Sequence, residues 1–299
     1  MARHYSRPEV REEVASYARD RWVAVHCELQ DQRGRRLLVR YRRGRPLKLS
    51  STRDVEALLA ELAKLRPRTF YASSNLYLNL SSETDVASLS NVYACTPCWD
   101  VDNELQGWRD TLRLCEELVA LLEKEGVAES VSVFWSGRGA HIRIHHEAFS
   151  PEVRSRIHPL DAAYAVVEYV ARKLASTWPT QPTSKGPRVE NKMDPQRVFT
   201  CPLSLHRELD AVCVCVPLNK LRDFDPSWTR PKAYRHSSEW RRFVKGEADE
   251  LALRAHEVVG GYPFRPRRRR RRYERLDEAI AKALAKQGLD DFKSLGPLT

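Results

Sequence analysis

Residues 99–104 read W-D-V-D-N-E and end an extended apolar run, residues 91–101, that predicts a buried strand. Asp100 and Asp102 are separated by one residue, so both side chains leave the same face of a strand, with Cα atoms about 6.5 to 7 Å apart. Two carboxylates placed in this way offer the hard oxygen ligands that a pair of divalent cations needs in phosphoryl displacement. A D-x-D pair alone also occurs as a strand end that faces water.

A hairpin is predicted just downstream, over residues 130–145, and its turn at 136–139 reads S-G-R-G. Glycines such as Gly139 let the backbone approach a ligand closely, and Ser136, Arg138 and His141 can donate hydrogen bonds to phosphate oxygens. The second strand alternates basic with apolar residues, which places three basic side chains on one face: His141, Arg143 and His145.

A third group combines carboxylates with cations within about twenty residues, as expected where phosphate and metal are bound together. It begins with P-R-V-E, which ends at Glu190, continues with Asp194 and Arg197, and ends with P-L-S-L-H-R, which contains His206. A lone loop histidine is usually structural. An acid pair, a glycine turn and this third group in one chain nevertheless favour a nucleotidyl-transfer site.

At these motifs, over about residues 66–226, the chain resembles the small catalytic subunit of archaeal and eukaryotic DNA primases and, more broadly, the primase-polymerase superfamily. W-D-V-D-N-E resembles the metal-binding D-x-D motif, and S-G-R-G-A-H resembles the nucleotide-binding S-G-x-x-G-x-H motif. P-R-V-E and P-L-S-L-H resemble the P-R-x-D and P-x-S-x-H elements. The resemblance implies an α+β fold, a primase-polymerase-type catalytic core of mixed sheets flanked by helices.

The resemblance also implies roles for single residues. Asp100, Asp102 and Glu190 are the expected catalytic ligands of two Mg²⁺ or Mn²⁺ ions. The expected nucleotide-binding residues are Ser136, Arg138, Gly139, His141, Arg197 and His206.

Three departures from the family motifs leave alternatives open. The second motif is one residue shorter than is common, and the third carboxylate is Glu rather than Asp, so Asp194 competes with Glu190 for that role. Glu208 stands where the family often has Lys, so Arg207 or Lys220 is expected to replace that charge.

The chain has 299 residues and a formal net charge of +11, which favours a polyanionic partner, and 42% hydrophobic residues, enough for a large core. We expect a catalytic domain at 1–260 and, at 261–299, an Arg-rich tract with a helix over 273–287. Such a charge run is usually solvated. Here we favour nucleic-acid contacts over docking on an acidic subunit, and assign them to Arg267, Arg268, Arg269 and Arg270.

Two further features bear on helices and on compartment. Apolar residues recur at helical spacing over 108–124 and 159–177, and predict two helices there. The absence of a long apolar run predicts no membrane span and an intracellular, cytoplasmic, nucleoid-associated protein.

Seven cysteines at irregular spacing do not form a disulfide framework pattern. Cys95 and Cys98 form one C-x-x-C, with Cys115 nearby but no second pair, and a structural zinc needs four ligands. Structural Zn²⁺ is therefore disfavoured against buried thiols or a disulfide.

The motifs favour a nucleotidyltransferase, and the resemblance implies that it is of the DNA-directed primase type. It would synthesise short RNA or DNA primers on a single-stranded DNA template from nucleoside triphosphates, together with a large primase subunit. One alternative is a stand-alone primase-polymerase for repair or plasmid replication, and another is a non-catalytic nucleic-acid-binding protein with a degenerate primase fold. Sugar preference, primer length and the need for a large subunit stay open at this point.

Overall fold

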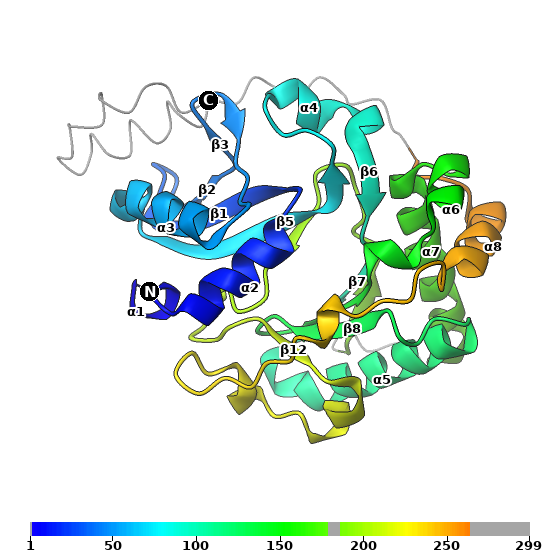
Figure 1. Ribbon diagram of the computed structural model, residues 1–299. Helices are drawn as coiled ribbons and strands as arrows, with labels where there is room; N and C mark the ends of the chain where they lie inside the picture. Colours follow the sequence, from blue (N-terminus) through cyan, green and yellow to red (C-terminus); the bar gives the residue numbers. More distant parts are fainter. Residues whose placement is uncertain (1, 179–185, 264–299) are drawn as a thin grey trace.

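The computed structural model describes residues 2–178 and 186–263 of the chain (Figure 1). The predicted arginine contacts at Arg267, Arg268, Arg269 and Arg270 and the helix predicted at 273–287 lie outside the described residues. Within them, two five-stranded sheets and their covering helices form the structure.

The first sheet has the strand order β11-β5-β1-β2, with β6 also paired to β5. Its strands are β1 (Arg21–Gln30), β2 (Arg36–Val39), β5 (Pro67–Tyr77), β6 (Val92–Cys95) and β11 (Val198–Thr200). Helix α2 (Pro8–Ala18) packs against β1 and β5 and against α3 (Thr52–Glu61). A capping box formed by Ser51 and Asp54 begins α3, because each side chain accepts a hydrogen bond from the other's backbone N–H.

The second sheet has the order β10-β7-β9-β8-β12 and carries most of the predicted site. Its strands are β7 (Cys98–Asp102), β8 (Val131–Trp135), β9 (Ala140–Ile144), β10 (Arg188–Glu190) and β12 (Val214–Val216). Helices α5 (Trp108–Lys124) and α7 (Pro159–Thr177) pack on it, and α8 (Asp249–Val259) packs on α7. Figure 1 shows α5 and α7 on the side of this sheet away from the first sheet.

Shorter elements complete the description. These are α1 (Ala2–Tyr5), α4 (Glu83–Ala87), α6 (Pro151–Arg156), β3 (Tyr41–Arg42), β4 (Arg45–Pro46) and the 3-10 helices η1 (Ala63–Leu65), η2 (Leu89–Asn91), η3 (Leu105–Gly107), η4 (His146–Ala148), η5 (Leu218–Asp223), η6 (Pro226–Thr229) and η7 (Glu239–Arg241).

The predicted α+β class, with sheets flanked by helices, is confirmed, and every strand pair among the described residues is antiparallel. The two helices predicted over 108–124 and 159–177 have those bounds in the structure. The apolar run predicted over 91–101 is two strands, β6 and β7, because the chain turns at Thr96 and Pro97 and passes from one sheet to the other. In the described part of the chain, no helix is both long and apolar enough to span a membrane.

Candidate active site

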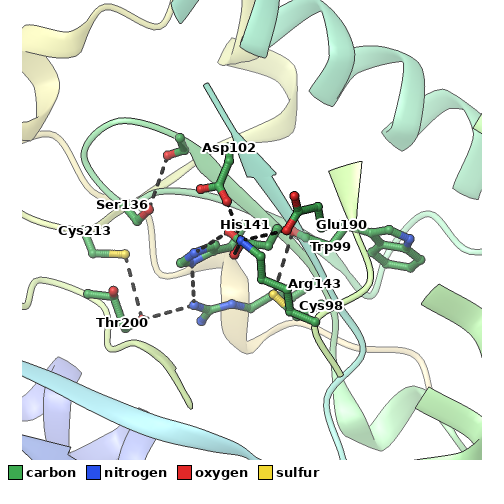
Figure 2. A network of polar contacts seen from close by, with 12 residues as sticks. Cys98, Trp99, Asp102, Ser136, His141, Arg143, Glu190, Thr200 and Cys213 are labelled. Atoms are coloured by element: carbon green, nitrogen blue, oxygen red, sulfur yellow. Dashed lines mark hydrogen bonds and ion pairs between the residues drawn. The ribbon is translucent and has the colours of Figure 1, made fainter. Parts of the chain in front are cut away.

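The acid pair faces away from the helices that cover the second sheet. On β7, Trp99 and Val101 are fully buried, and the indole Nε1 of Trp99 donates to the carbonyl of Val167 in α7, 3.0 Å away. Since side chains alternate along a strand, Asp100 and Asp102 leave the opposite face. The antiparallel register then places Glu190 of β10 on one side of Asp100 and His141 of β9 on the other. Local alternation and strand pairing together therefore gather these polar side chains on one face (Figure 2).

Lys192 joins the three predicted carboxylates. Its Nζ lies 2.7 Å from Asp100 Oδ2 and 3.3 Å from Glu190 Oε2, and it also contacts Asp102 Oδ2. Burial favours the protonated form of Asp100, but hydrogen bonds from His141 and Lys192, together with the charge of Lys192, outweigh it and hold the pKa of this carboxyl well below its usual range. Burial opposes the charge on Lys192, yet Asp100 and Asp102 raise the pKa of its ammonium. Lys192 is not predictable from the sequence, because a single lysine two residues beyond Glu190 forms no pattern.

His141 links the acid pair to a buried arginine. Its Nδ1 lies 3.3 Å from Arg143 Nη2, and its Nε2 lies 3.2 Å from Asp100 Oδ1 (Figure 2). Arginine has no acceptor, so Nδ1 accepts and the ring proton on Nε2 is directed at Asp100. The guanidinium of Arg143 thereby sets the tautomer that orients an acid-pair carboxylate.

Two residues of the predicted basic stripe, His141 and Arg143, are buried on β9, whereas His145 lies just beyond the end of the strand and is only partly buried. His141 is 7% exposed and Arg143 only 2%, and Arg143 Nη2 also donates to the carbonyl of Thr200 in β11. The aromatic rings of Phe134 and Phe199 pack against the guanidinium, 4.1 and 5.8 Å from its carbon. His141 and Arg143 therefore lie in the interior next to the first sheet, and only the His141 end of the stripe reaches the site.

The glycine turn lies directly on β7. A Cβ on Gly139 would stand 2.1 Å from the carbonyl oxygen of Val101, so only glycine allows this approach. The backbone N–H of Ser136 donates to the carbonyl of Gly139 at 3.0 Å and closes the turn. Gly137, at φ +133°, leaves room for the ring of His206, whose Cδ2 would be 2.5 Å from a Cβ there. The close approach brings Ser136 and Arg138 beside the acids.

His206 presents a neutral donor to this site. Its Nδ1 accepts hydrogen bonds from the backbone N–H groups of Glu208 and Leu209, at 3.1 and 2.9 Å, which places the ring proton on Nε2. Burial and the nearby charge of Arg207 lower the pKa of His206 to about 4. The side chain is therefore a hydrogen-bond donor without charge at neutral pH.

Two of the predicted phosphate-binding cations are paired with carboxylates. Arg138 Nη2 lies 3.0 Å from Glu208 Oε2, with both side chains about half exposed, and Arg197 Nη2 lies 3.1 Å from Asp194 Oδ2. Asp194 thus pairs with an arginine, whereas Glu190 contacts the lysine shared by the acid pair.

One cavity of about 860 Å³ unites these elements. Most of the predicted metal- and nucleotide-binding residues in the described part of the chain line this cavity: Asp100, Asp102, Ser136, Arg138, Gly139, His141, Arg197 and His206. The exception is Glu190, which lies on β10 opposite Asp100. Arg207 also lines it, so of the two cations expected to replace the missing lysine, Arg207 is at the site. A volume of this size accommodates a nucleotide.

The carboxylates fit a cation, although the described residues hold no ready-made group of three His, Cys, Asp or Glu ligands. The observation that supports the fit is Lys192, since a positive nitrogen already lies within contact of Asp100, Asp102 and Glu190. A divalent ion would compete with this ammonium for the same oxygens.

The cysteines have no bearing on the cavity. All seven are buried without a disulfide, and burial raises the pKa of Cys95 and Cys98 to about 12, so both are neutral thiols at neutral pH.

No protein family model matches this sequence, and no curated protein sequence matches it. Among solved structures, the chain is similar to the polymerase domain of Ligase D from Mycobacterium tuberculosis, determined in complex with DNA. The TM-score is 0.53 at 14% sequence identity, and the match covers 87% of this chain and 88% of that chain. The likeness extends over most of both chains and supports the predicted primase-polymerase-type fold.

Proposed function

We propose that this protein is a metal-dependent nucleotidyltransferase that builds a nucleic-acid strand on a DNA template, and that it serves as a DNA primase catalytic subunit. The single observation that supports this most is the shared cavity, in which an acid pair lies together with a glycine turn, an arginine and two histidines. The carboxylates suit divalent cations, and the neighbouring hydrogen-bond donors suit a triphosphate.

The expected role of each residue follows from its charge. Asp100, Asp102 and Glu190 would hold Mg²⁺ or Mn²⁺, which supplies charge stabilisation for in-line displacement at an α-phosphate. Arg138 would leave Glu208 and bind the triphosphate, and the Nε2–H of His206 would donate to it without adding charge. His141 keeps Asp100 oriented and ionised through its Nε2–H.

The first experiment removes the acid pair. Asp100→Ala combined with Asp102→Ala is expected to abolish templated synthesis while DNA binding is largely retained, and Asp110→Ala on α5 is the matched control. Templated synthesis that persists in the double variant would contradict the proposal.

The stand-alone primase-polymerase is a second candidate, and one observation favours it. The similar solved structure is a polymerase domain bound to DNA. We suggest comparing primer synthesis from nucleotides alone with extension of a supplied primer, with ribo- and deoxynucleotides and with and without a large subunit. De novo synthesis that depends on a second subunit supports the primase role, whereas efficient extension by the isolated chain supports the alternative.

The non-catalytic alternative also has structural support. Lys192 forms an ion pair with the carboxylate of Asp100, and Glu208 forms one with Arg138. The groups expected to bind metal and those expected to bind triphosphate are therefore already paired with opposite charges within the protein. Calorimetric titration with Mn²⁺ and with a nucleoside triphosphate separates the cases. A protein that binds neither would be a nucleic-acid-binding scaffold, and binding of both supports the enzyme.

A further inference from the structure

A second cavity, of about 200 Å³, lies between the end of α2, the end of β9 and η7. Four arginines line it, Arg19, Arg21, Arg143 and Arg241, against a single carboxylate, Asp20. Arg241 is paired with Glu13 at 2.8 Å, and Asp20 accepts a hydrogen bond from the hydroxyl of Tyr93. The lining is therefore strongly positive.

Two of these arginines are buried, and no carboxylate of the described residues forms an ion pair with either. Arg21 is 3% exposed and donates to the carbonyls of Ser73 and Ser74 and to the hydroxyl of Thr96, all neutral oxygens. Arg143 is 2% exposed, and its Nε and Nη1 have no oxygen or nitrogen acceptor among the described residues, although the Cys98 thiol shares a hydrogen bond with the guanidinium. A buried charge of this kind is costly unless an opposite charge or a full set of hydrogen bonds compensates it.

The phenol and the thiols packed against the two guanidinium groups carry no negative charge at neutral pH. The carbons of both groups lie 4.8 Å from the centre of the Tyr17 ring, and burial raises the pKa of that phenol. The thiols next to Arg143 belong to Cys98 and Cys213, and burial raises the pKa of each to about 12. These aromatic faces and neutral thiols do not neutralise the two positive charges.

We propose that this cavity binds a small tetrahedral oxyanion of the phosphate class, held by the guanidinium groups of Arg143 and Arg21. Guanidinium groups bind such ions through paired N–H donors. The volume lies below the roughly 300–1,000 Å³ of pockets that enclose drug-sized ligands, which favours an ion over a nucleotide. A strand phosphate would have to bring its sugars to a side chain that is 2% exposed, so the free ion is the better fit.

Arg143 links the two cavities. Its Nη2 donates to His141 and to the carbonyl of Thr200, two residues that line the larger cavity, and its side chain lines the second one. Anion binding there does not require the candidate active site to be catalytic, so the test stands whether or not the proposed function does.

The experiment observes the Nε–H signals of arginine by NMR in ¹⁵N-labelled full-length protein during titration with inorganic phosphate, at ionic strength held constant with chloride. The Arg143 signal is assigned by its absence from Arg143→Met. We expect a saturable shift of that signal, and calorimetry should show that Arg143→Met weakens phosphate binding by about tenfold or more, because a charge-assisted contact is lost.

Matched variants locate the effect. Arg138→Gln removes one positive charge from the larger cavity and should keep the Arg143 shift, whereas exposed Arg19→Met, at the rim of the second cavity, should weaken it even if Arg143→Met fails to fold. A single-stranded oligonucleotide without a terminal phosphate should leave the signal in place. The proposal is overturned by an Arg143 signal that does not saturate, by loss of the shift in Arg138→Gln, or by a larger response to the oligonucleotide than to phosphate.

Discussion

Lys192 Nζ lies 2.7 Å from Asp100 Oδ2 and also contacts the carboxylates of Asp102 and Glu190. It therefore touches all three carboxylates that are predicted to bind metal. This relationship makes the lysine a built-in competitor for the cation. An ammonium can leave such a position by rotating its flexible stem, so the site can exchange a fixed internal charge for a divalent ion.

The first prediction concerns this competition. Lys192→Met should raise the affinity for Mn²⁺ by about tenfold or more, because the cation no longer has to displace an ammonium from the carboxylates. A tenfold change in the binding constant corresponds to about 1.4 kcal/mol. Isothermal titration with Mn²⁺ measures it, and Lys173→Met, which removes a lysine paired with Glu125 on the far helices, is the control. An unchanged affinity would show that the lysine does not occupy the metal position.

A second prediction separates the two candidates for the third carboxylate. Glu190 stands opposite Asp100 in the register, whereas Asp194 pairs with Arg197. Glu190→Gln should reduce templated synthesis by about a hundredfold, as expected when one group that stabilises developing charge is lost. Asp194→Asn should reduce it far less. Single-turnover synthesis rates decide between them, and a reversed order would exchange the two roles.

A third prediction uses the contact between the glycine turn and β7. Gly139→Ala would force a Cβ to 2.1 Å from the Val101 carbonyl oxygen, so the turn must move. We expect a loss of about 1–3 kcal/mol in the free energy of unfolding, typical of overpacking, together with weaker nucleotide binding. Gly186→Ala, where a Cβ meets nothing within 4 Å, should be nearly neutral in denaturant titrations. Equal stability of the two variants would contradict the close approach.

A fourth prediction concerns the charge at Arg138. Glu208→Gln removes its partner, and we expect the KM for nucleotide to fall a few-fold, since a half-exposed ion pair contributes only about 0–1 kcal/mol. Glu116→Gln, which removes the partner of Arg222 on a different surface, serves as the control. If KM rises instead, Glu208 orients Arg138 rather than neutralising it.

A fifth prediction follows from His145, where burial and the charge of Arg21 lower the pKa to about 4. In the unfolded chain this imidazole has a pKa near 6.5, so it binds a proton more readily there than in the folded protein. The free energy of unfolding is therefore unaffected by this histidine above about pH 6.5, and it decreases as the pH falls from about 6.5 to about 4. His145→Asn keeps an acceptor for the backbone N–H of Glu147 and removes the titration. Between pH 7 and 5 the free energy of unfolding of this variant should fall by about 2 kcal/mol less than that of the wild type. Identical losses in urea titrations would contradict the shift.

Much of the fold follows from local patterns. The helices α5 and α7 have their predicted bounds because their apolar residues recur every three or four positions, and a buried face needs nothing more specific than that. The acid pair and the glycine turn are also predictable from adjacent residues, because the spacing in D-x-D places both side chains on one face of a strand and the glycines of S-G-R-G favour a turn.

What the sequence by itself determined is therefore the class of the fold, the alternation that puts Asp100 and Asp102 on one face, and many of the polar residues that meet in the cavity. Only the tertiary structure decided that Lys192 bridges the acids, that Glu190 rather than Asp194 contacts it, and that Arg143 is buried between two cavities. The physical reason is that a strand's sequence specifies which side chains share a face, whereas the charge and solvent at that face depend on segments that arrive from elsewhere in the chain, here β10, β11 and α2.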